Sequence, residues 1–144
     1  MSRQVDSWIE GDFNGYDYGA IFRLDNGLVL QQASAAYVYV YAYRPRATVY
    51  WNGQQLMLQV QGMPSGVPII QVDTLDEGVI VSDFKGFQGQ SLFQFQNGHV
   101  WQQAEYKYSY QYAYRPEAIV IDGVDGPQLQ VEGMDEPVRV RRVR

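Results

Sequence analysis

The chain contains no cysteine and a single histidine, His99. Without cysteine there are no disulfides and no thiolate ligands, and one histidine does not supply the clusters typical of zinc sites. Nucleophile systems of the Ser-His-Asp or Cys-His kind are therefore unsupported. His99 follows an Asn-Gly pair, and we interpret it as an ordinary strand-surface residue. We predict no catalytic residue, no metal site and no cofactor, and hence a protein that is not an enzyme.

Long hydrophobic runs and a positive charge balance are also missing. The longest strongly apolar stretch, residues 35–43, is too short to cross a membrane as a helix, and the N-terminus shows no segment typical of a secretory signal. Eleven Lys and Arg against 16 Asp and Glu give a net charge of −5, which argues against a nucleic-acid partner. We therefore expect a cytoplasmic protein with neither a nucleic-acid nor a membrane partner.

The chain does contain an internal sequence repeat. A displacement of 71 positions aligns residues 11–63 with residues 82–134 without a gap, with 24 identities in 53 pairs. Chance does not produce this, so we infer an internal duplication. Beyond residue 63 we expect two residues to be lost, so that Pro68 aligns with Pro137.

Both copies have the sequence pattern of strands. No segment shows a convincing 3.6-residue period, whereas the Asn-Gly pairs at 26–27 and 97–98 separate apolar runs and predict hairpins with type I′ turns. The alternating valines and arginines of residues 138–144 predict a last strand with its valines inward and its arginines in water; the alternative is a strip that binds an anion. Five or six short antiparallel strands per copy fit a small barrel.

The expected domain boundaries follow from the repeat. We place a first barrel over residues 1–72 and a second over residues 79–144. Residues 73–78, Asp-Thr-Leu-Asp-Glu-Gly, are short and acidic, and we interpret them as the linker.

Two segments of the second copy carry a resemblance to a known group of proteins. Residues 97–103, Asn-Gly-His-Val-Trp-Gln-Gln, and residues 112–116, Tyr-Ala-Tyr-Arg-Pro, resemble small uncharacterised, largely cyanobacterial proteins with one SH3-like barrel. The resemblance covers about half of each copy, and the first copy departs from it with Leu30 where the second has Trp101. It implies an all-β fold of two tandem SH3-like small antiparallel barrels related by internal duplication, and it implies no activity.

A tyrosine at every second position marks one strand of each copy. Alternate side chains of a strand share a face, so the tyrosines of residues 37–43 and of residues 106–114 form two rows. Each row either packs inward with its hydroxyls at the rim, or forms an aromatic platform that stacks a ligand. The candidate platform consists of Tyr39, Tyr41, Tyr43, Trp51, Trp101, Tyr110, Tyr112 and Tyr114.

The faces opposite these rows differ between the copies. The second copy carries Lys107, Ser109 and Gln111 there, whereas the first carries the apolar strip, which we define as Ala36, Val38, Val40 and Ala42. Because equivalent strands should share the same interior, we expect the apolar strip to face outward as an interaction surface. The second barrel, an identical chain or another protein would cover it; the alternative is drift of small residues on an exposed face.

These observations lead to two functional hypotheses. The first is a non-enzymatic protein-binding or self-assembly module, with a homodimer as one outcome, that acts through the apolar strip. The alternative is a binder of a small ligand or glycan that uses the aromatic faces.

Overall fold

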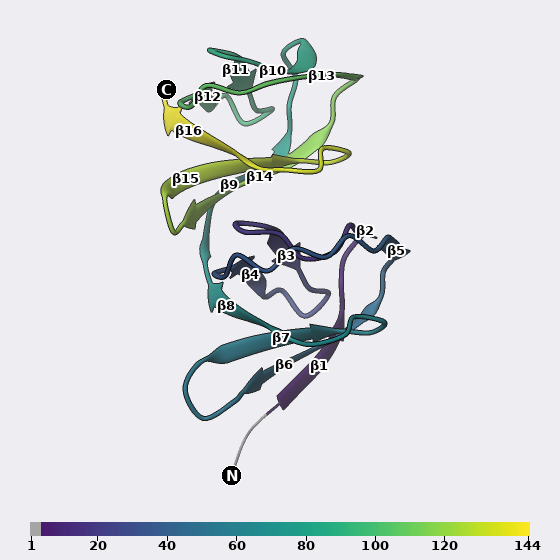
Figure 1. Cartoon of the computed structure of the whole chain (residues 1–144). Coiled ribbons are helices and arrows are strands. Elements are labelled where there is room, and N and C mark those ends of the chain that lie inside the picture. The colour runs from purple at the N-terminus through teal and green to yellow at the C-terminus, as the bar shows by residue number, and fades with distance from the viewer. Residues whose placement is uncertain (1–3) are drawn as a thin grey trace. The chain divides into compact units, whose positions relative to one another are not determined.

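The computed structural model describes residues 4–144, which fold entirely into strands, turns and loops. The chain divides into two compact units, residues 1–72 (unit 1) and residues 73–144 (unit 2) (Figure 1). Within the described residues, no helix is long and apolar enough to cross a membrane. The prediction of an all-β fold is thus confirmed.

Unit 1 has one large and one small sheet. Its strands are β1 (Gln4–Trp8), β2 (Asp12–Phe13), β3 (Ile21–Arg23), β4 (Val29–Gln32), β5 (Ala42–Tyr43), β6 (Arg46–Trp51), β7 (Leu56–Val60) and β8 (Val67–Gln71). The six-stranded sheet has the order β1-β6-β7-β8-β4-β3, and β2 pairs with β5. The large sheet curls, and an isolated bridge joins Ile9 to Leu24 beyond its edges.

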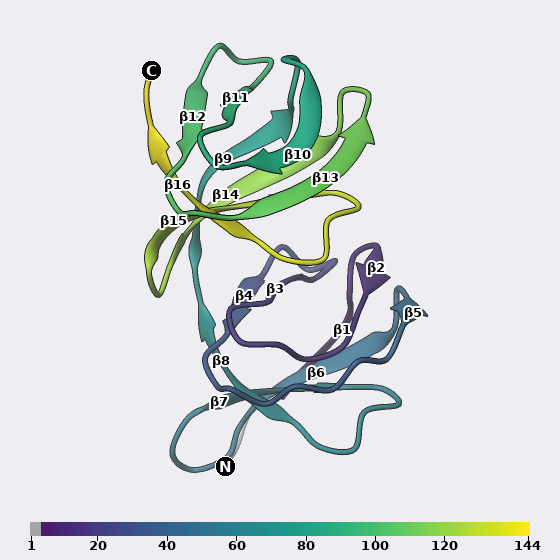
Figure 2. The same cartoon turned by 45° about the horizontal axis from the view of Figure 1, so that its top comes forward.

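Unit 2 repeats this arrangement. Its strands are β9 (Asp73–Val79), β10 (Phe84–Gln88), β11 (Leu92–Gln94), β12 (Val100–Gln103), β13 (Tyr108–Ala113), β14 (Glu117–Gly123), β15 (Gly126–Val131) and β16 (Val138–Arg142). Read from β9, the large sheet has the order β9-β14-β15-β16-β12-β11, which matches unit 1 strand for strand. The small sheet is β10 with β13, which lie side by side in Figure 2. An Ile80–Phe95 bridge corresponds to the Ile9–Leu24 bridge.

The expected linker is a strand. Residues 73–79 form β9, which pairs with β14 at the edge of the large sheet of unit 2. Acidic side chains concealed the strand in the sequence, since Asp73 and Glu77 stay exposed on an edge strand where charges face water. The strand lacks the apolar alternation that identifies a half-buried strand.

The closing strands correct the end of the alignment. Met57 pairs with Pro68 in unit 1, and Gln128, which is 71 positions after Met57, pairs with Arg139 in unit 2. Arg139 is also 71 positions after Pro68. The repeat therefore runs to the last strand with no loss of residues, and the alignment of Pro68 with Pro137 is wrong. The buried Val67 and Val138 are the true equivalents, because each packs into its own core.

Both predicted Asn-Gly hairpins form, but with another turn. Gly27 donates its N–H to the carbonyl of Leu24 at 3.0 Å and has φ of 93°, whereas Asn26 is not among the positive-φ residues. A type I′ turn needs positive φ at both central residues, so this is the longer turn that ends in a left-handed glycine. Asn26 Oδ1 also accepts the N–H of Leu28 at 3.0 Å, and this side-chain bond stabilises the turn.

Each unit has its own apolar core. Phenylalanines dominate the core of unit 2, where Phe87 and Phe93 meet edge to face with ring centroids 6.2 Å apart. In unit 1 Tyr16 takes the place of Phe87 and remains 2% exposed, with its hydroxyl donating to the carbonyl of Ser65 at 2.8 Å. A buried tyrosine needs such a partner, because an unpaired hydroxyl in the core is costly.

Candidate functional site

Both tyrosine rows face solvent. The side chains of the row in unit 1 are 55–69% exposed, and those of the row in unit 2 are 63–87% exposed. The row in unit 1 is Tyr37, Tyr39, Tyr41 and Tyr43, and the row in unit 2 is Tyr106, Tyr108, Tyr110, Tyr112 and Tyr114. Inward packing of these tyrosines is therefore wrong. Of the alternate positions, Val38 and Ala42 in unit 1 and Ala113 in unit 2 pack against the cores.

Only half of the apolar strip contacts the core of unit 1. Val38 and Ala42 are half-buried and pack against the core of unit 1, while Ala36 and Val40 are more exposed. Val38 also forms a backbone bridge with Tyr16. The expectation of an outward strip therefore fails for Val38 and Ala42, which pack inward, while Ala36 and Val40 are exposed.

Two of the polar residues opposite the row of unit 2, Lys107 and Gln111, have partners within unit 2. The Lys107 ammonium group donates to the Pro137 carbonyl at 3.0 Å and to Glu136 Oε2 at 3.2 Å. Gln111 Nε2 donates to the Gly133 carbonyl at 3.1 Å. The turn between β15 and β16 thus satisfies these side chains, and the difference between the copies requires no outside partner.

The two candidate platform tryptophans occupy different environments. Trp51 ends β6 and is 51% exposed, so it remains available for contacts. Trp101 in β12 is 4% exposed and belongs to the core of unit 2. Its place in the predicted platform is therefore wrong, because the burial of its ring leaves no face for a ligand.

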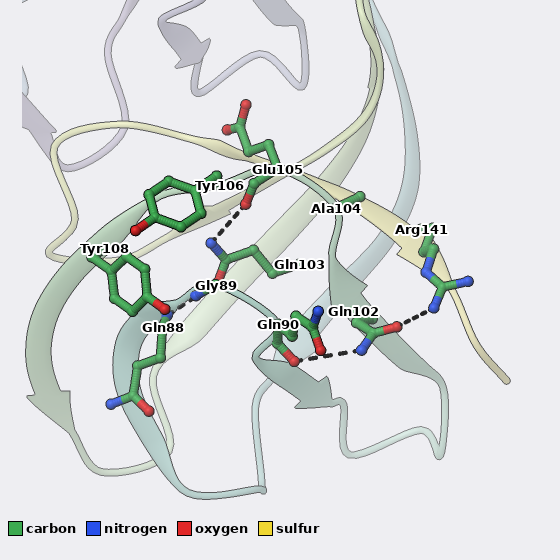
Figure 3. Close-up of a pocket in the computed structure, with 10 residues that line it drawn as sticks. All are labelled: Gln88, Gly89, Gln90, Gln102, Gln103, Ala104, Glu105, Tyr106, Tyr108 and Arg141. Carbon is green, nitrogen blue, oxygen red and sulfur yellow. Dashed lines mark hydrogen bonds between the residues drawn. The ribbon is translucent and has the colours of Figure 1, made fainter.

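An open pocket of about 680 Å³ lies at the beginning of the row of unit 2 (Figure 3). It is lined by Gln88, Gly89, Gln90, Gln102, Gln103, Ala104, Glu105, Tyr106, Tyr108 and Arg141. The rings of Tyr106 and Tyr108 meet edge to face with centroids 5.1 Å apart. In Figure 3 this pair lies on the opposite side of the pocket from Gln102 and Arg141. The pocket therefore combines an aromatic wall with a polar one.

Gln103 holds the backbone around the pocket. Its Oε1 accepts the N–H groups of Gln88 and Gly89, both at 3.1 Å. Its Nε2 donates to the carbonyls of Glu105 at 3.0 Å and Lys107 at 2.7 Å. With both ends of its amide occupied, this buried side chain has a structural role and fixes the shape of the pocket.

The two charged lining residues differ in their partners. Glu105 accepts hydrogen bonds from the Arg139 backbone N–H at 3.2 Å and the Arg139 Nε at 3.1 Å. Burial raises the pKa of Glu105, but these bonds and the nearby Lys107 charge outweigh it, and the pKa lies below its ordinary value. Arg141 donates to Gln102 Oε1, which is a neutral acceptor. Its positive charge has no carboxylate partner in the described part of the chain.

The equivalent positions of unit 1 lack these features. At a displacement of 71, Ile70 stands for Arg141, Ala35 for Tyr106 and Tyr18 for Gly89. A Cβ at Gly89 would lie 3.0 Å from the Tyr108 hydroxyl, so glycine leaves space for that ring. The charge, the tyrosine pair and the space beside it are therefore properties of unit 2 alone.

Sequence reasoning missed a second polar group, centred on Asp76 in β9. Its carboxylate is buried and accepts bonds from Trp101 Nε1, His99 Nδ1 and Asn97 Nδ2, each at 2.8 Å. The backbone N–H of Glu77 adds a fourth bond at 3.1 Å. An irregularity in the pairing of β9 with β14, next to Asp76, is the kind of bulge that redirects a side chain. The duplication held the signal, since unit 1 has Val5, Leu28 and Leu30 where unit 2 has the acid, the histidine and the tryptophan.

This cluster keeps Asp76 ionised. Burial raises its pKa, but the bonds from Trp101, Asn97 and His99, together with the charge of His99, outweigh burial and lower the pKa below 3.8. A carboxylate that orients a histidine is also part of many general-base systems. The partners bonded to this pair are an amide, an indole and a backbone N–H, and none of them is a nucleophile.

No group of three or more side chains able to hold a metal ion occurs within residues 4–144. No protein-family model matches the chain, and neither the curated proteins nor the solved structures gave a significant match.

Proposed function

We propose that this protein is a non-enzymatic protein-binding module whose contact surface is the exposed tyrosine row, foremost that of unit 2. The observation that carries the proposal is the exposure of Tyr106, Tyr108, Tyr110 and Tyr112, each above 60%. Tyrosine presents a large, rigid contact area with a polar tip at low cost in side-chain entropy, and it is enriched at protein interfaces. The apolar strip, which first suggested this class of function, plays no part in the proposal.

The row of unit 2 has a firmer backbone than that of unit 1. In unit 2 six residues of the segment form β13, paired with β10 over Phe84–Gln88. In unit 1 only Ala42 and Tyr43 form a strand, and Val38 adds a bridge. A regular strand holds alternate rings on one face at about 6.8 Å spacing, which suits an extended partner. This favours unit 2 as the principal binding unit.

We further propose that each unit is an SH3-like barrel and that the pair arose by internal duplication. The matching sheet orders and the constant displacement of 71 positions support this. The expected cytoplasmic location stays a prediction.

A glycan is the second candidate ligand, and one observation favours it. The pocket beside Tyr106 and Tyr108 offers glutamine and arginine side chains, which donate to hydroxyl groups, next to aromatic rings that stack on sugar faces. A peptide is preferred because the row extends through Tyr110 and Tyr112, well past the pocket lining.

Selection from a display library of random 12-residue peptides tests the proposal. Peptides selected on the wild-type chain should bind a variant with Tyr106, Tyr108, Tyr110 and Tyr112 changed to serine at least about tenfold more weakly. Leu92→Ser is the matched control, because Leu92 is 54% exposed in β11 and lies outside the row. Light scattering of both proteins reveals self-association through the same row. A library without binders, together with an unchanged mass, contradicts the proposal.

A further inference from the structure

The positive charge of Arg141 is the feature of the pocket that its surroundings leave uncompensated. The neutral Gln102 orients the guanidinium, while Glu105 is engaged by Arg139 and Lys107. On a chain of net charge −5, a cation that lines a pocket without a carboxylate partner in the described residues stands out. A guanidinium carries five donors in one plane, so the bond to Gln102 leaves most of them available.

From this we infer that the pocket of unit 2 binds a carboxylate of an extended peptide, with Arg141 as the anchor and the Tyr106–Tyr108 pair contacting the neighbouring peptide residues. The inference rests on the proposed protein-binding function and names the chemistry of the partner. The carboxylate belongs to an aspartate or glutamate side chain or to a free C-terminus, which present the same group to Arg141.

The geometry of the walls supports this ligand. Figure 3 places the Arg141–Gln102 pair across the pocket from the two rings, so a peptide between them meets a cation on one side and an aromatic face on the other. The rings hold each other edge to face at 5.1 Å, which limits their freedom before binding. The buried Gln103 fixes the backbone on which Tyr106 and Gly89 stand. These contacts reduce the conformational freedom that the pocket loses on binding.

An extended peptide matches this surface better than an acidic sugar. Its side chains repeat every two residues on one face, as do the tyrosines that continue from Tyr108 to Tyr110 and Tyr112. A carboxylate held at Arg141 therefore sets the register of the following residues on the row. An acidic sugar would satisfy Arg141 equally but has no such repeat, and the test below makes it a separate outcome.

Unit 1 provides the contrast within the same chain. Ile70 replaces Arg141, and Ala35 replaces the first tyrosine of the pair. We therefore expect the row of unit 1 to show no preference for a carboxylate.

Fluorescence anisotropy with three forms of each selected peptide tests the inference. One form has a free C-terminus, one has an amidated C-terminus, and one has Asn and Gln in place of Asp and Glu. Each form is titrated with the wild-type protein, with Arg141→Gln and with the control Arg142→Gln. Arg142 is also exposed but does not line the pocket. Loss of the carboxylate and Arg141→Gln should each weaken binding about tenfold, without adding when combined, while Arg142→Gln leaves binding within about twofold.

The outcomes separate the two proposals. If selected peptides bind through the tyrosines but tolerate Arg141→Gln, or carry no essential carboxylate, the inference is overturned and the protein-binding function stands. If no peptide binds, the inference fails; if light scattering also shows no self-association through the row, the protein-binding function fails with it. If tetragalacturonate binds in an Arg141-dependent manner and no peptide does, the site is an anion site for sugars and the peptide assignment is overturned. A C-terminal or a side-chain carboxylate is identified by which of the two modified forms loses affinity.

Discussion

The carboxylate of Asp76 in β9 accepts a hydrogen bond of 2.8 Å from the indole nitrogen of Trp101 in β12. These strands are not neighbours: β9 is one edge of the large sheet of unit 2, and β12 is next to the other edge. The bond therefore joins distant parts of a curled sheet across its interior, and His99 and Asn97 from the adjacent hairpin bond the same carboxylate. In unit 1 the apolar Val5, Leu28 and Leu30 occupy the positions of Asp76, His99 and Trp101.

Asp76→Asn should lower the free energy of unfolding of unit 2 by about 1–3 kcal/mol at pH 7, since it weakens the acceptor for the buried Trp101 and the half-buried His99 as well as for Asn97. Trp101 is the single tryptophan of unit 2 and is buried, so its fluorescence reports on that unit. Urea unfolding is measured with Trp8 and Trp51 changed to phenylalanine, because both are exposed and would obscure the signal. An equal midpoint for wild type and variant would show that the cluster contributes nothing.

The same residue predicts a pH dependence. The pKa of Asp76 is lower in the folded chain than its ordinary value of 3.8, so the unfolded chain binds this proton more readily. The stabilisation is thus fully present above about pH 4 and is lost as the pH falls through the folded pKa. The difference in unfolding free energy between wild type and Asp76→Asn should shrink as the pH falls below about 4. Glu105→Gln is the comparison, since the lowered pKa of Glu105 acts in the same direction at an unrelated place.

The repeat, the hairpins and the all-β fold were accessible from sequence, because they depend on identities and local turn residues. The direction of the tyrosine segments was not. A strand that alternates Tyr110 and Tyr112 with Ser109 and Gln111 has two faces, but the alternation does not show whether either face is buried. Tyrosine is suited to either, and the decision depends on which side the large sheet lies.

Two further features depended on pairing rather than pattern. The acidic residues of β9 led to its interpretation as a linker, although an edge strand can also be polar. Only the pairing of β9 with β14 shows that the segment is a strand. In the Asp76 cluster, the side chains that bond Asp76 lie 21 to 25 positions after it in the sequence. No motif spacing in the sequence joins them to it. The mismatch between Val5 and Asp76, combined with that between Leu30 and Trp101, was the available signal.

For the apolar strip we predict an effect on the stability of unit 1 rather than on association with a partner. Val38→Ser introduces the residue that unit 2 carries at the same position, but Val38 packs against the core of unit 1. We expect a loss of about 1–2 kcal/mol in the stability of unit 1 and no change in molecular mass by light scattering. Val40→Gln is the milder control, because Val40 is 37% exposed. A change of mass with unchanged stability would restore the strip as an interface.

Because the tyrosine row of unit 2 is exposed, we expect a substitution in it to weaken binding without lowering stability. Tyr110 is 74% exposed in β13, so Tyr110→Ser should change the free energy of unfolding by no more than about 0.5 kcal/mol. The substitution should nevertheless weaken the binding of peptides selected on the wild-type chain. Phe87→Ser provides the reverse case, since Phe87 is 1% exposed in the core and its loss should unfold unit 2. A Tyr110→Ser chain that unfolds as readily as Phe87→Ser would assign the row a structural role.

The crossing of the tyrosine segment over Gly86 gives the sharpest prediction for the fold. A Cβ at Gly86 would lie 1.9 Å from the Ser109 carbonyl oxygen, and the equivalent Gly15 has the same 1.9 Å approach to the Val38 carbonyl. Because backbone atoms cause the clash, no rotamer relieves it, and β13 must move away from β10.

Gly98 is the matched control, since its φ of 93° is close to the 88° of Gly86 but open space surrounds its Cβ position. Gly98→Ala therefore measures the strain of positive φ alone, about 1 kcal/mol. Gly86→Ala should cost about 1–3 kcal/mol more, and it should also weaken peptide binding by displacing the row. Equal losses of stability in the two variants, measured by urea unfolding, would show that β13 does not approach β10 as closely as described.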